Sequence, residues 1–511
     1  MRGRGRLQVL APLLALLVVA TGCTGGSNES VAFRPSVQDV QCPSDVEVQL
    51  VVQHSCMFLT VPENRSQPGG RTIRVFVVKI EPPDSPPDPD PMLVLGGDLG
   101  NPAVLGGISP ISSRVHRVAY VMELRGVGHS EPSLSCPEVD GLAAEAAAAR
   151  TSDLPFRSDF LSAVGACRDR LVGQGIDLAA YDVQQTAADV EDLRGALGIP
   201  EWNLLSLGSD SRFTLEVVRE FPEHVRSMVT DSPQFPQVDE ATGAVTGTRN
   251  ALDELFKECA GDPSCDAAFP KLQRTWESAL AGLEANPIEL SAREAPGQGR
   301  VLVDAGKFLR AARLALGGDG PSDLEGLPAS IAAAADGHLS PEISSILAYD
   351  PTLCAGYRPA CPQGAFAFGE YLTVFCRDEA PFVDRATLAG SVAGDPPLDA
   401  VFGDHPYLAA CDVWDVPPAS ASVQQPVTSV VPTLALVGQF DSFSPVAIAR
   451  EALASFSSGY LVEIPGQTHN VLGFGDCAVS IRNAWIDHPT SAPTDTSCLR
   501  AQEVHFLTKA L

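Results

Sequence analysis

The chain has 511 residues, of which 45% are apolar and 19% charged, a composition typical of a globular protein rather than a disordered one. Its length exceeds what a single hydrophobic core usually supports, so we expect a large main domain with an inserted or appended unit. The formal net charge of −28 excludes nucleic acid as an expected partner and argues against binding to anionic lipid through surface charge.

The N-terminal segment 1–22 is predicted to be a signal peptide. Three arginines precede an apolar run, ending at Ala20, that is too short to span a bilayer comfortably. Small residues then lead directly into Cys23, which resembles a bacterial lipobox with Cys23 as the lipidated residue; plain secretion is the alternative. The Gly/Ser-rich sequence that follows predicts a flexible tether over 23–41. We therefore expect an exported protein held at the outer face of the cell membrane by its N-terminal lipid alone.

Thirteen cysteines support the prediction of export. Removing Cys23 leaves an even number, which predicts disulfides in an exported chain. The twelve candidates are Cys42, Cys56, Cys136, Cys167, Cys259, Cys265, Cys354, Cys361, Cys376, Cys411, Cys477 and Cys498. Pairs taken in chain order would close loops of 6 to 35 residues, but the connectivity cannot be deduced from the sequence. No Cys-x-x-Cys or His-x-x-x-His spacing occurs, so we predict no metal and no cofactor.

Strand and helix signals alternate through residues 42–236. The segment 72–78 alternates apolar and polar residues in places, as opening antiparallel strands do, whereas 92–95 is a short apolar run typical of a buried parallel strand. Further elements are expected in the order strand, helix, strand, helix and strand, over 118–122, 186–197, 202–207, the residues up to 221, and 227–230. This alternation predicts a doubly wound, mostly parallel α/β sheet with helices on both faces.

The pattern changes to helices over 237–425, which predicts a helical cap inserted into the sheet domain. Its clearest helices are expected at 253–259, 271–283 and 307–316. Strand signals return at 433–437 and 460–464, so the sheet domain resumes over 426–511.

The stretch from Trp202 to Arg212 is typical of a buried strand, a sharp turn and the start of a helix. This is the setting of the nucleophile elbow of α/β-hydrolases, written G-x-S-x-G. Here the five positions are Ser206, Leu207, Gly208, Ser209 and Asp210, so a glycine stands where the attacking serine is expected. A glycine has no Oγ with which to attack a substrate.

Two later residues complete the pattern of a catalytic triad. Asp441 follows one buried strand, and His469 lies in the loop after the next. An acid and then a histidine at the carboxyl ends of late strands is the chain order of the α/β-hydrolase triad. The chemistry needs both, because the acid fixes the imidazole tautomer and the imidazole takes the proton of the nucleophile.

The chain resembles the tripeptidyl-aminopeptidase-like branch of the proline-iminopeptidase α/β-hydrolases. The stretches that carry this resemblance are Cys56–Ile73, Arg125–Cys136, Thr186–Asn203, Phe221–Ser232 and the closing pair Cys477 and Cys498. It implies an α/β-hydrolase core with an inserted cap and a tripeptidyl-aminopeptidase-like C-terminal region. It also fixes the register, since the family's nucleophile precedes the position of Pro222 by the fourteen residues that lead back to Gly208. Asp441 and His469 would be the retained acid and base.

The resemblance also locates the oxyanion loop at Gly96 and Gly97. Here Asp98 follows them, and Asp210 stands two residues after the nucleophile position. Carboxylates at these places oppose the stabilisation of negative charge that an oxyanion hole supplies. Two acids alone are too few to hold a cation, so we interpret Asp98 and Asp210 as solvated acids of their loops.

We therefore expect a cell-envelope lipoprotein with a hydrolase fold and an impaired serine site. It would bind a peptide, another small ligand or an envelope partner in the cleft between core and cap. The alternative is an active exported serine hydrolase, an aminopeptidase or esterase, in which Ser209 acts as a displaced nucleophile with His469 and Asp441. In the first case Ser209 would supply only an oxyanion-hole N–H.

Overall fold

The computed structural model describes residues 33–509 except for 51, 83–87, 107–115, 153, 292, 295–298, 318–320, 349–365, 404–405 and 474. The predicted signal peptide and Cys23 lie outside the described residues, as do Cys354 and Cys361. Among the described helices, none has both the length and the apolar character needed to cross a membrane.

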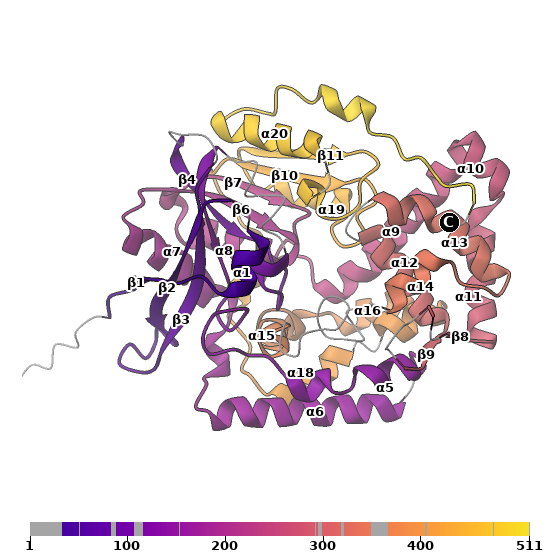
Figure 1. Cartoon of the computed structure of the whole chain (residues 1–511), viewed down its shortest axis with the longest axis horizontal. Coiled ribbons are helices and arrows are strands. Elements are labelled where there is room, and N and C mark those ends of the chain that lie inside the picture. Colours follow the sequence, from indigo (N-terminus) through magenta and orange to yellow (C-terminus); the bar gives the residue numbers. More distant parts are fainter. Residues whose placement is uncertain are drawn as a thin grey trace, which may run out of the picture.

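Nine strands of the described chain form one twisted sheet in the order β1-β2-β3-β5-β4-β6-β7-β10-β11 (Figure 1). Their bounds are β1 Ser36–Val40, β2 His54–Pro62, β3 Thr72–Ile80, β4 Asp88–Leu95, β5 Arg117–Met122, β6 Trp202–Leu207, β7 Val225–Asp231, β10 Thr433–Gly438 and β11 Gly459–Ile464. Pairing is antiparallel from β1 to β5 and parallel from β5 to β11. The predicted doubly wound, mostly parallel sheet is therefore confirmed.

The sheet begins earlier than the sequence suggested. Strand β1 lies within the segment 23–41, predicted as a tether, and pairs with β2 so that Ser36 faces Thr60 and Val40 faces Cys56. The disulfide between Cys42 and Cys56 closes this edge directly after β1. An ordered edge strand thus replaces the last part of the predicted tether.

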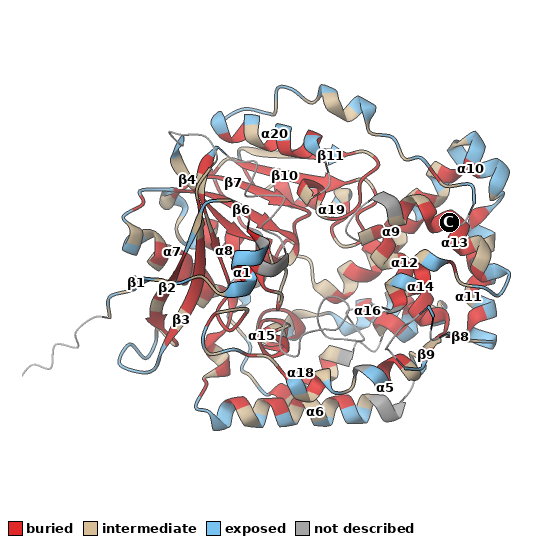
Figure 2. Cartoon of the chain, viewed as in Figure 1, coloured by how far each residue is buried: buried red, intermediate tan, exposed pale blue. Residues whose placement is uncertain are grey.

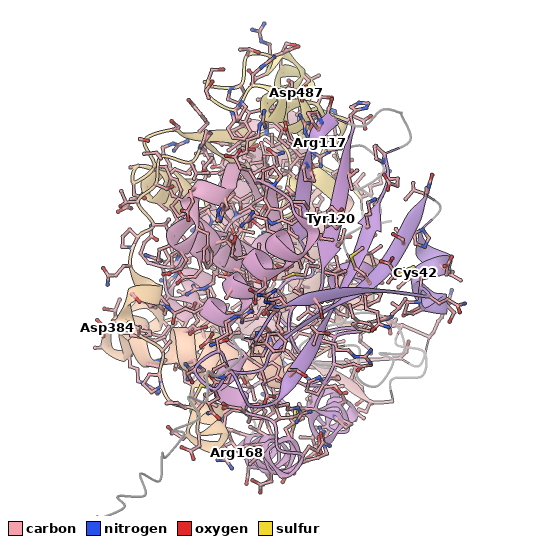
Figure 3. The ribbon with its side chains drawn as sticks, turned by 90° about the vertical axis from the view of Figure 1, so that its left-hand side faces the viewer. Cys42, Arg117, Tyr120, Arg168, Asp384 and Asp487 are labelled. Atoms are coloured by element: carbon pink, nitrogen blue, oxygen red, sulfur yellow. A yellow bond between two sulfur atoms is a disulfide. The ribbon has the colours of Figure 1, made fainter. Side chains whose placement is uncertain are left out.

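Helices cover both faces of the sheet. One face packs on α7 (Val183–Leu197), α8 (Ser211–Glu220) and α19 (Val446–Leu453), and the other on α1 (Ser44–Gln49), α2 (Ala103–Gly106) and α20 (Asp476–Asp487). Figure 2 shows the buried residues concentrated along the strands and the inner sides of these helices. In Figure 3, Arg117 of β5 and Asp487 of α20 lie together, and their ion pair of 2.8 Å holds the end of α20 to the sheet.

Helix α7 illustrates how the local sequence sets an element. The Asp182 side chain accepts a hydrogen bond from the Gln185 N–H and caps the helix start. Gly198 takes a left-handed conformation (φ +68°) and ends the helix, as the sequence predicted. The residues in between bury one side, with Ala187, Val190 and Leu193 almost fully inaccessible.

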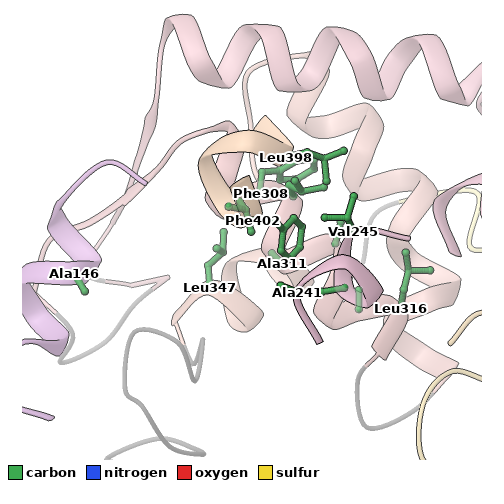
Figure 4. Packing of buried hydrophobic residues seen from close by; sticks show 14 of the residues in the cluster. Ala146, Ala241, Val245, Phe308, Ala311, Leu316, Leu347, Leu398 and Phe402 are labelled. Carbon is green, nitrogen blue, oxygen red and sulfur yellow. The ribbon is translucent and has the colours of Figure 1, made fainter. Parts of the chain in front are cut away.

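The insertion is mainly helical, as predicted. Its helices are α9 Glu240–Gly261, α10 Pro263–Ala268, α11 Leu272–Ala285, α12 Ala305–Gly317, α13 Pro321–Ala335, α14 Pro341–Ala348, α15 Phe368–Val374, α16 Arg385–Val392, α17 Pro396–Leu398 and α18 Pro406–Trp414. It also contains a hairpin that the sequence analysis missed, formed by β8 (Ile288–Leu290) and β9 (Val301–Val303). Figure 4 shows the interior of this unit, where Phe308 of α12 packs near Leu398 and Phe402.

Three helices from the first half of the chain join this insertion. They are α4 (Pro137–Asp140), α5 (Ala143–Ala148) and α6 (Leu154–Gly173), and their apolar residues share a core with the inserted helices. Figure 1 shows α6 running beneath α18, away from the sheet. The cap is thus assembled from two stretches of the chain, one of which falls in the range predicted to be core.

Five disulfides are formed among the described cysteines. The pairs are Cys42–Cys56, Cys136–Cys167, Cys259–Cys265, Cys376–Cys411 and Cys477–Cys498. Each joins neighbours in chain order, one of the arrangements that the sequence left open.

Candidate active site

Gly208 lies at a strand–turn–helix junction, as the sequence predicted. Strand β6 is buried along its whole length and runs into a single 3₁₀ turn, Gly208–Asp210, that leads into α8. Gly208 adopts φ +51°, a left-handed conformation that glycine takes without the steric cost of a Cβ atom. Because β4 and β6 are parallel neighbours, the loop after β4 meets this turn at the carboxyl edge of the sheet.

Asp441 and His469 come together beside this turn. Asp441 follows β10, His469 follows β11, and both side chains are almost completely buried. The His469 Nδ1 lies 3.0 Å from each carboxylate oxygen of Asp441. The N–H groups of Phe443 and Ser444 each donate to Asp441 Oδ1 at 2.8 Å, which fixes the carboxylate. The structure therefore brings the predicted acid and histidine into contact.

The other imidazole nitrogen faces Gly208. A Cβ atom placed on Gly208 with ideal geometry would lie 3.1 Å from His469 Nε2. The same atom would lie only 1.9 Å from Asp98 Oδ1, a separation that two non-bonded atoms cannot adopt. The space that a side chain at position 208 would need beside the histidine is occupied by the Asp98 carboxylate.

Asp98 is held in this place by the turn itself. Its backbone is left-handed (φ +61°), which is uncommon for a residue with a side chain. Its Oδ1 accepts hydrogen bonds from the Ser209 N–H at 2.9 Å and the Ser209 Oγ–H at 3.2 Å. The N–H of the residue after the nucleophile is one of the two donors of an α/β-hydrolase oxyanion hole. Here that donor is already bonded to a carboxylate.

The loop donors that follow β4 are also used within the protein. The Leu99 N–H donates to Ser209 Oγ at 2.8 Å, and the Gly97 N–H donates to Asp210 Oδ2 at 2.9 Å. Gly97 has no room for a side chain, since its Cβ would lie 2.0 Å from the Asn101 carbonyl oxygen. A Cβ atom on Gly96 would lie 3.0 Å from a side-chain carbon of Leu207 in β6. The predicted oxyanion loop is therefore packed against the turn at position 208.

Ser209 lies at this junction but does not contact the histidine. Its Oγ is engaged with Leu99 and Asp98, and no hydrogen bond to His469 occurs within the described part of the chain. Ser206 points into the core, where its Oγ bonds to Thr214 and Thr230. The geometry thus gives neither neighbouring serine the base that a nucleophile requires.

The electrostatics of the histidine follow from its acidic surroundings. Burial by itself lowers the pKa of His469, but Asp441, with smaller contributions from Asp98 and Asp231, raises it overall to about 9. Burial would likewise raise the pKa of Asp441, yet the interaction with His469 brings it below its ordinary value. A general base must be neutral to accept a proton, and this imidazole is mainly protonated near pH 7.

Two carboxyl groups behind the turn, Asp210 and Glu370, form no ion pair with any described residue. Burial, and then the nearby Asp98, raise the pKa of Asp210 well above its ordinary value. Glu370 of α15 is raised well above its ordinary pKa by burial and by Asp210. Asp210 Oδ1 and Glu370 Oε2 are buried without a hydrogen-bond partner in the described chain. Burial and the neighbouring carboxyl groups therefore favour the neutral form of both side chains.

Two acids outside the predicted triad support the site, and neither was predicted to anchor a loop of it. Asp231, at the end of β7, accepts hydrogen bonds from the Val471 and Leu472 N–H groups at 3.0 and 2.8 Å and so anchors the loop that carries His469. Glu123, after β5, accepts from the Ala103 and Val104 N–H groups and anchors the segment after the oxyanion loop. Their position at the ends of buried strands is the signal that could have identified them.

Metal-binding chemistry finds little support among the described residues. Two groups of ligand-type side chains lie close together, Cys42 with Glu47 and His54, and Cys136 with Glu138 and Cys167. The three cysteines are in disulfides and offer no thiolate. Asp98 and Asp210 are each committed to backbone N–H groups of the turn and loop.

Comparison with known proteins agrees with this architecture. Residues 399–498 match the model of the TAP-like protein family. The chain is 24% identical to the serine protease Hip1 of Mycobacterium tuberculosis over 96% of its own length and 97% of that protein. It is 27% identical to the tripeptidyl aminopeptidase of Streptomyces lividans over 41% of this chain and 40% of the relative. The resemblance to tripeptidyl-aminopeptidase-like hydrolases is therefore confirmed.

Solved structures similar to this chain include α/β-hydrolases. The proline iminopeptidase of Mycobacterium smegmatis is 12% identical, with a TM-score of 0.39 over 82% of this chain and 96% of that one. A thermophilic esterase from Thermogutta terrifontis is 11% identical, with a TM-score of 0.35 over 82% of this chain and 95% of that one.

Proposed function

We propose that this protein is a tripeptidyl-aminopeptidase-like α/β-hydrolase whose serine site no longer hydrolyses substrates and whose role is to bind a peptide or another small ligand. The observation that carries the proposal is the position of Asp98. Its carboxylate fills the space beside His469 Nε2 that a side chain at position 208 would occupy, and it takes the N–H of Ser209. The acid and base are in contact, but the position that faces His469 Nε2 offers no nucleophile.

Three requirements of serine hydrolysis are unmet in this arrangement. Gly208 offers no hydroxyl, the Ser209 N–H is bonded to an anion instead of to a developing oxyanion, and the raised pKa of His469 leaves little neutral imidazole. Loss of the nucleophile alone already removes most of the activity of triad enzymes. The combination supports a binding role over a catalytic one.

A ligand would reach the site between the sheet and the inserted helices. The insertion packs there against the loop after β4 and against α8, with the Ala367 N–H donating to the Gly100 carbonyl oxygen at 2.8 Å and Arg212 forming an ion pair with Glu379. Peptides are the favoured class because the serine protease and the aminopeptidase to which the chain is similar act on them by name. The five disulfides and the predicted lipobox at Cys23 support a location in the cell envelope.

The proposal is tested by treating the purified protein with a fluorophosphonate probe and with tripeptide p-nitroanilides and p-nitrophenyl acetate. We expect neither labelling nor turnover above that of a His469→Ala variant. Labelling of the wild type that disappears in His469→Ala would show an active serine hydrolase and overturn the proposal. A Ser209→Ala variant, compared in parallel, would then show whether Ser209 is the labelled residue.

A further inference from the structure

A guanidinium group enters the site region from the insertion. Arg313 of α12 places its Cζ 3.8 Å from the ring centroid of Phe443, whose ring in turn lies 5.1 Å from that of His469. The Ser442 Oγ–H donates to the Arg313 carbonyl oxygen at 2.9 Å, so α12 is fixed to the loop that carries Asp441. The Phe443 ring therefore neighbours both the Arg313 guanidinium and the His469 imidazole.

The arginine has no anionic partner among the described residues. No ion pair or hydrogen bond of its guanidinium occurs there, its Nε–H is buried without an acceptor, and its close contacts are the rings of Phe443 and Phe402. Burial lowers the pKa of Arg313 to about 10, which still leaves the group charged at neutral pH. The charges of Glu240 and Asp441 oppose this lowering, but a partly buried cation without a hydrogen-bonded anion remains costly.

The groups that face Arg313 are engaged elsewhere. Asp441 is held by His469 and by two backbone N–H groups. Burial raises the pKa of Glu240, and its carboxyl accepts a hydrogen bond from the Tyr371 hydroxyl at 3.5 Å. Arg310 is a further cation in this environment. The guanidinium is therefore free to accept an anion from outside.

We infer that Arg313 anchors a carboxylate of the bound ligand, so that the site takes peptides or other small molecules carrying one carboxylate group. A guanidinium matches a carboxylate with two parallel N–H···O bonds, and the unused Nε–H is one of the donors such a pair requires. A monoanion fits better than a dianion, because Asp98 and Asp441 already place negative charge near the site. This inference rests on the proposed binding function and specifies its ligand class.

The test compares three probes with the full chain by isothermal titration calorimetry. They are N-acetyl-Ala-Ala-Ala as the free acid, the same peptide as its amide, and N-acetyl-Ala-Asp-Ala amide, which separate a terminal carboxylate, no carboxylate and a side-chain carboxylate. We expect at least one acid to bind about tenfold more tightly than the neutral amide. Arg313→Gln should remove that preference, and Arg313→Lys should retain part of it.

Arg300→Gln is the matched control. Arg300 directly precedes β9 in the same insertion, is exposed and pairs with Glu289, so its loss removes one charge without touching the site. Equal binding of acid and amide by the wild type, or an acid preference that survives in Arg313→Gln, would overturn the inference while leaving ligand binding itself intact. Failure of the wild type to bind any probe would overturn it as well. The labelling experiment on His469 tests the absence of catalysis separately.

Discussion

At the scale of single residues, the site depends on the relation between positions 98 and 208. Asp98 Oδ1 and a Cβ at position 208 would be 1.9 Å apart, so a side chain at one position excludes the observed side chain at the other. The elbow pattern and the register set by the family resemblance located Gly208, and the acid and histidine were predicted from their place after two late strands, now β10 and β11. The occupation of the site by Asp98 could not be predicted, because it depends on side-chain directions across two loops separated by more than a hundred residues.

The exclusion gives a stability prediction. Gly208→Ala should lower the free energy of unfolding by about 2–4 kcal/mol, through the left-handed backbone and the clash with Asp98. In an Asp98→Gly background only the backbone cost of about 1–2 kcal/mol should remain. Urea denaturation of the four proteins measures the difference. Equal costs in both backgrounds would show that Asp98 does not occupy this space.

His469 gives a prediction about pH. Its pKa is raised from 6.5 to about 9 in the folded protein, so its interaction with Asp441 contributes stability that is complete below about pH 6.5 and is lost as the pH rises through 9. The stability difference between wild type and His469→Gln should therefore shrink over this range. An NMR titration of the imidazole gives the midpoint directly, and Asp98→Asn should lower it. A midpoint near 6.5 would contradict the account.

At the scale of elements, periodicity located most of the sheet and several long helices. The buried runs at 92–95 and 202–207 became β4 and β6, and Gly198 ended α7 as expected. The hairpin β8–β9 was missed because its strands have three residues each, too few to establish an alternating pattern. The assignment of α4 to α6 to the cap was also missed, since helical periodicity shows which side of a helix is buried but not against what.

The ion pair that joins the core to the insertion can be tested by mutation. Arg212 of α8 and Glu379, which follows α15, form a buried ion pair. Arg212→Met alone should cost about 3–5 kcal/mol, because it leaves a buried carboxylate without its partner. The double variant Arg212→Met with Glu379→Met should recover much of that loss. Denaturant unfolding measures the stability of the single and double variants. A double variant that loses as much stability as the two single variants together would exclude coupling between Arg212 and Glu379.

At the scale of the whole molecule, two units stabilise the fold. One is the sheet, which helices cover on both faces, and the other is the cap, which disulfides cross-link. Cys136–Cys167 joins α4 to α6, and Cys376–Cys411 joins the segment after α15 to α18. Both lie in the cap region, whose helices share one continuous apolar core. The sequence could predict that cysteines pair, but connectivity required the fold.

Replacing one disulfide should lower the free energy of unfolding measurably. The loop closed by Cys136 and Cys167 spans 31 residues, and opening it by Cys136→Ala with Cys167→Ala should lower stability by about 3–4 kcal/mol. Thermal unfolding and mass mapping of the non-reduced wild type check the cost and the pairing together. A different partner for Cys136 in the peptide map would refute the arrangement.

We propose that Gly208 and Asp98 together silence a site whose acid and base are in place. The measurement that tests it most directly is fluorophosphonate labelling of Gly208→Ser and of the double variant Asp98→Gly with Gly208→Ser. The account predicts no labelling of the single variant, because Asp98 occupies the space of the new side chain, and labelling of the double variant that is abolished by His469→Ala. Equal labelling of the single and double variants, or none that depends on His469 in a correctly folded double variant, would contradict it.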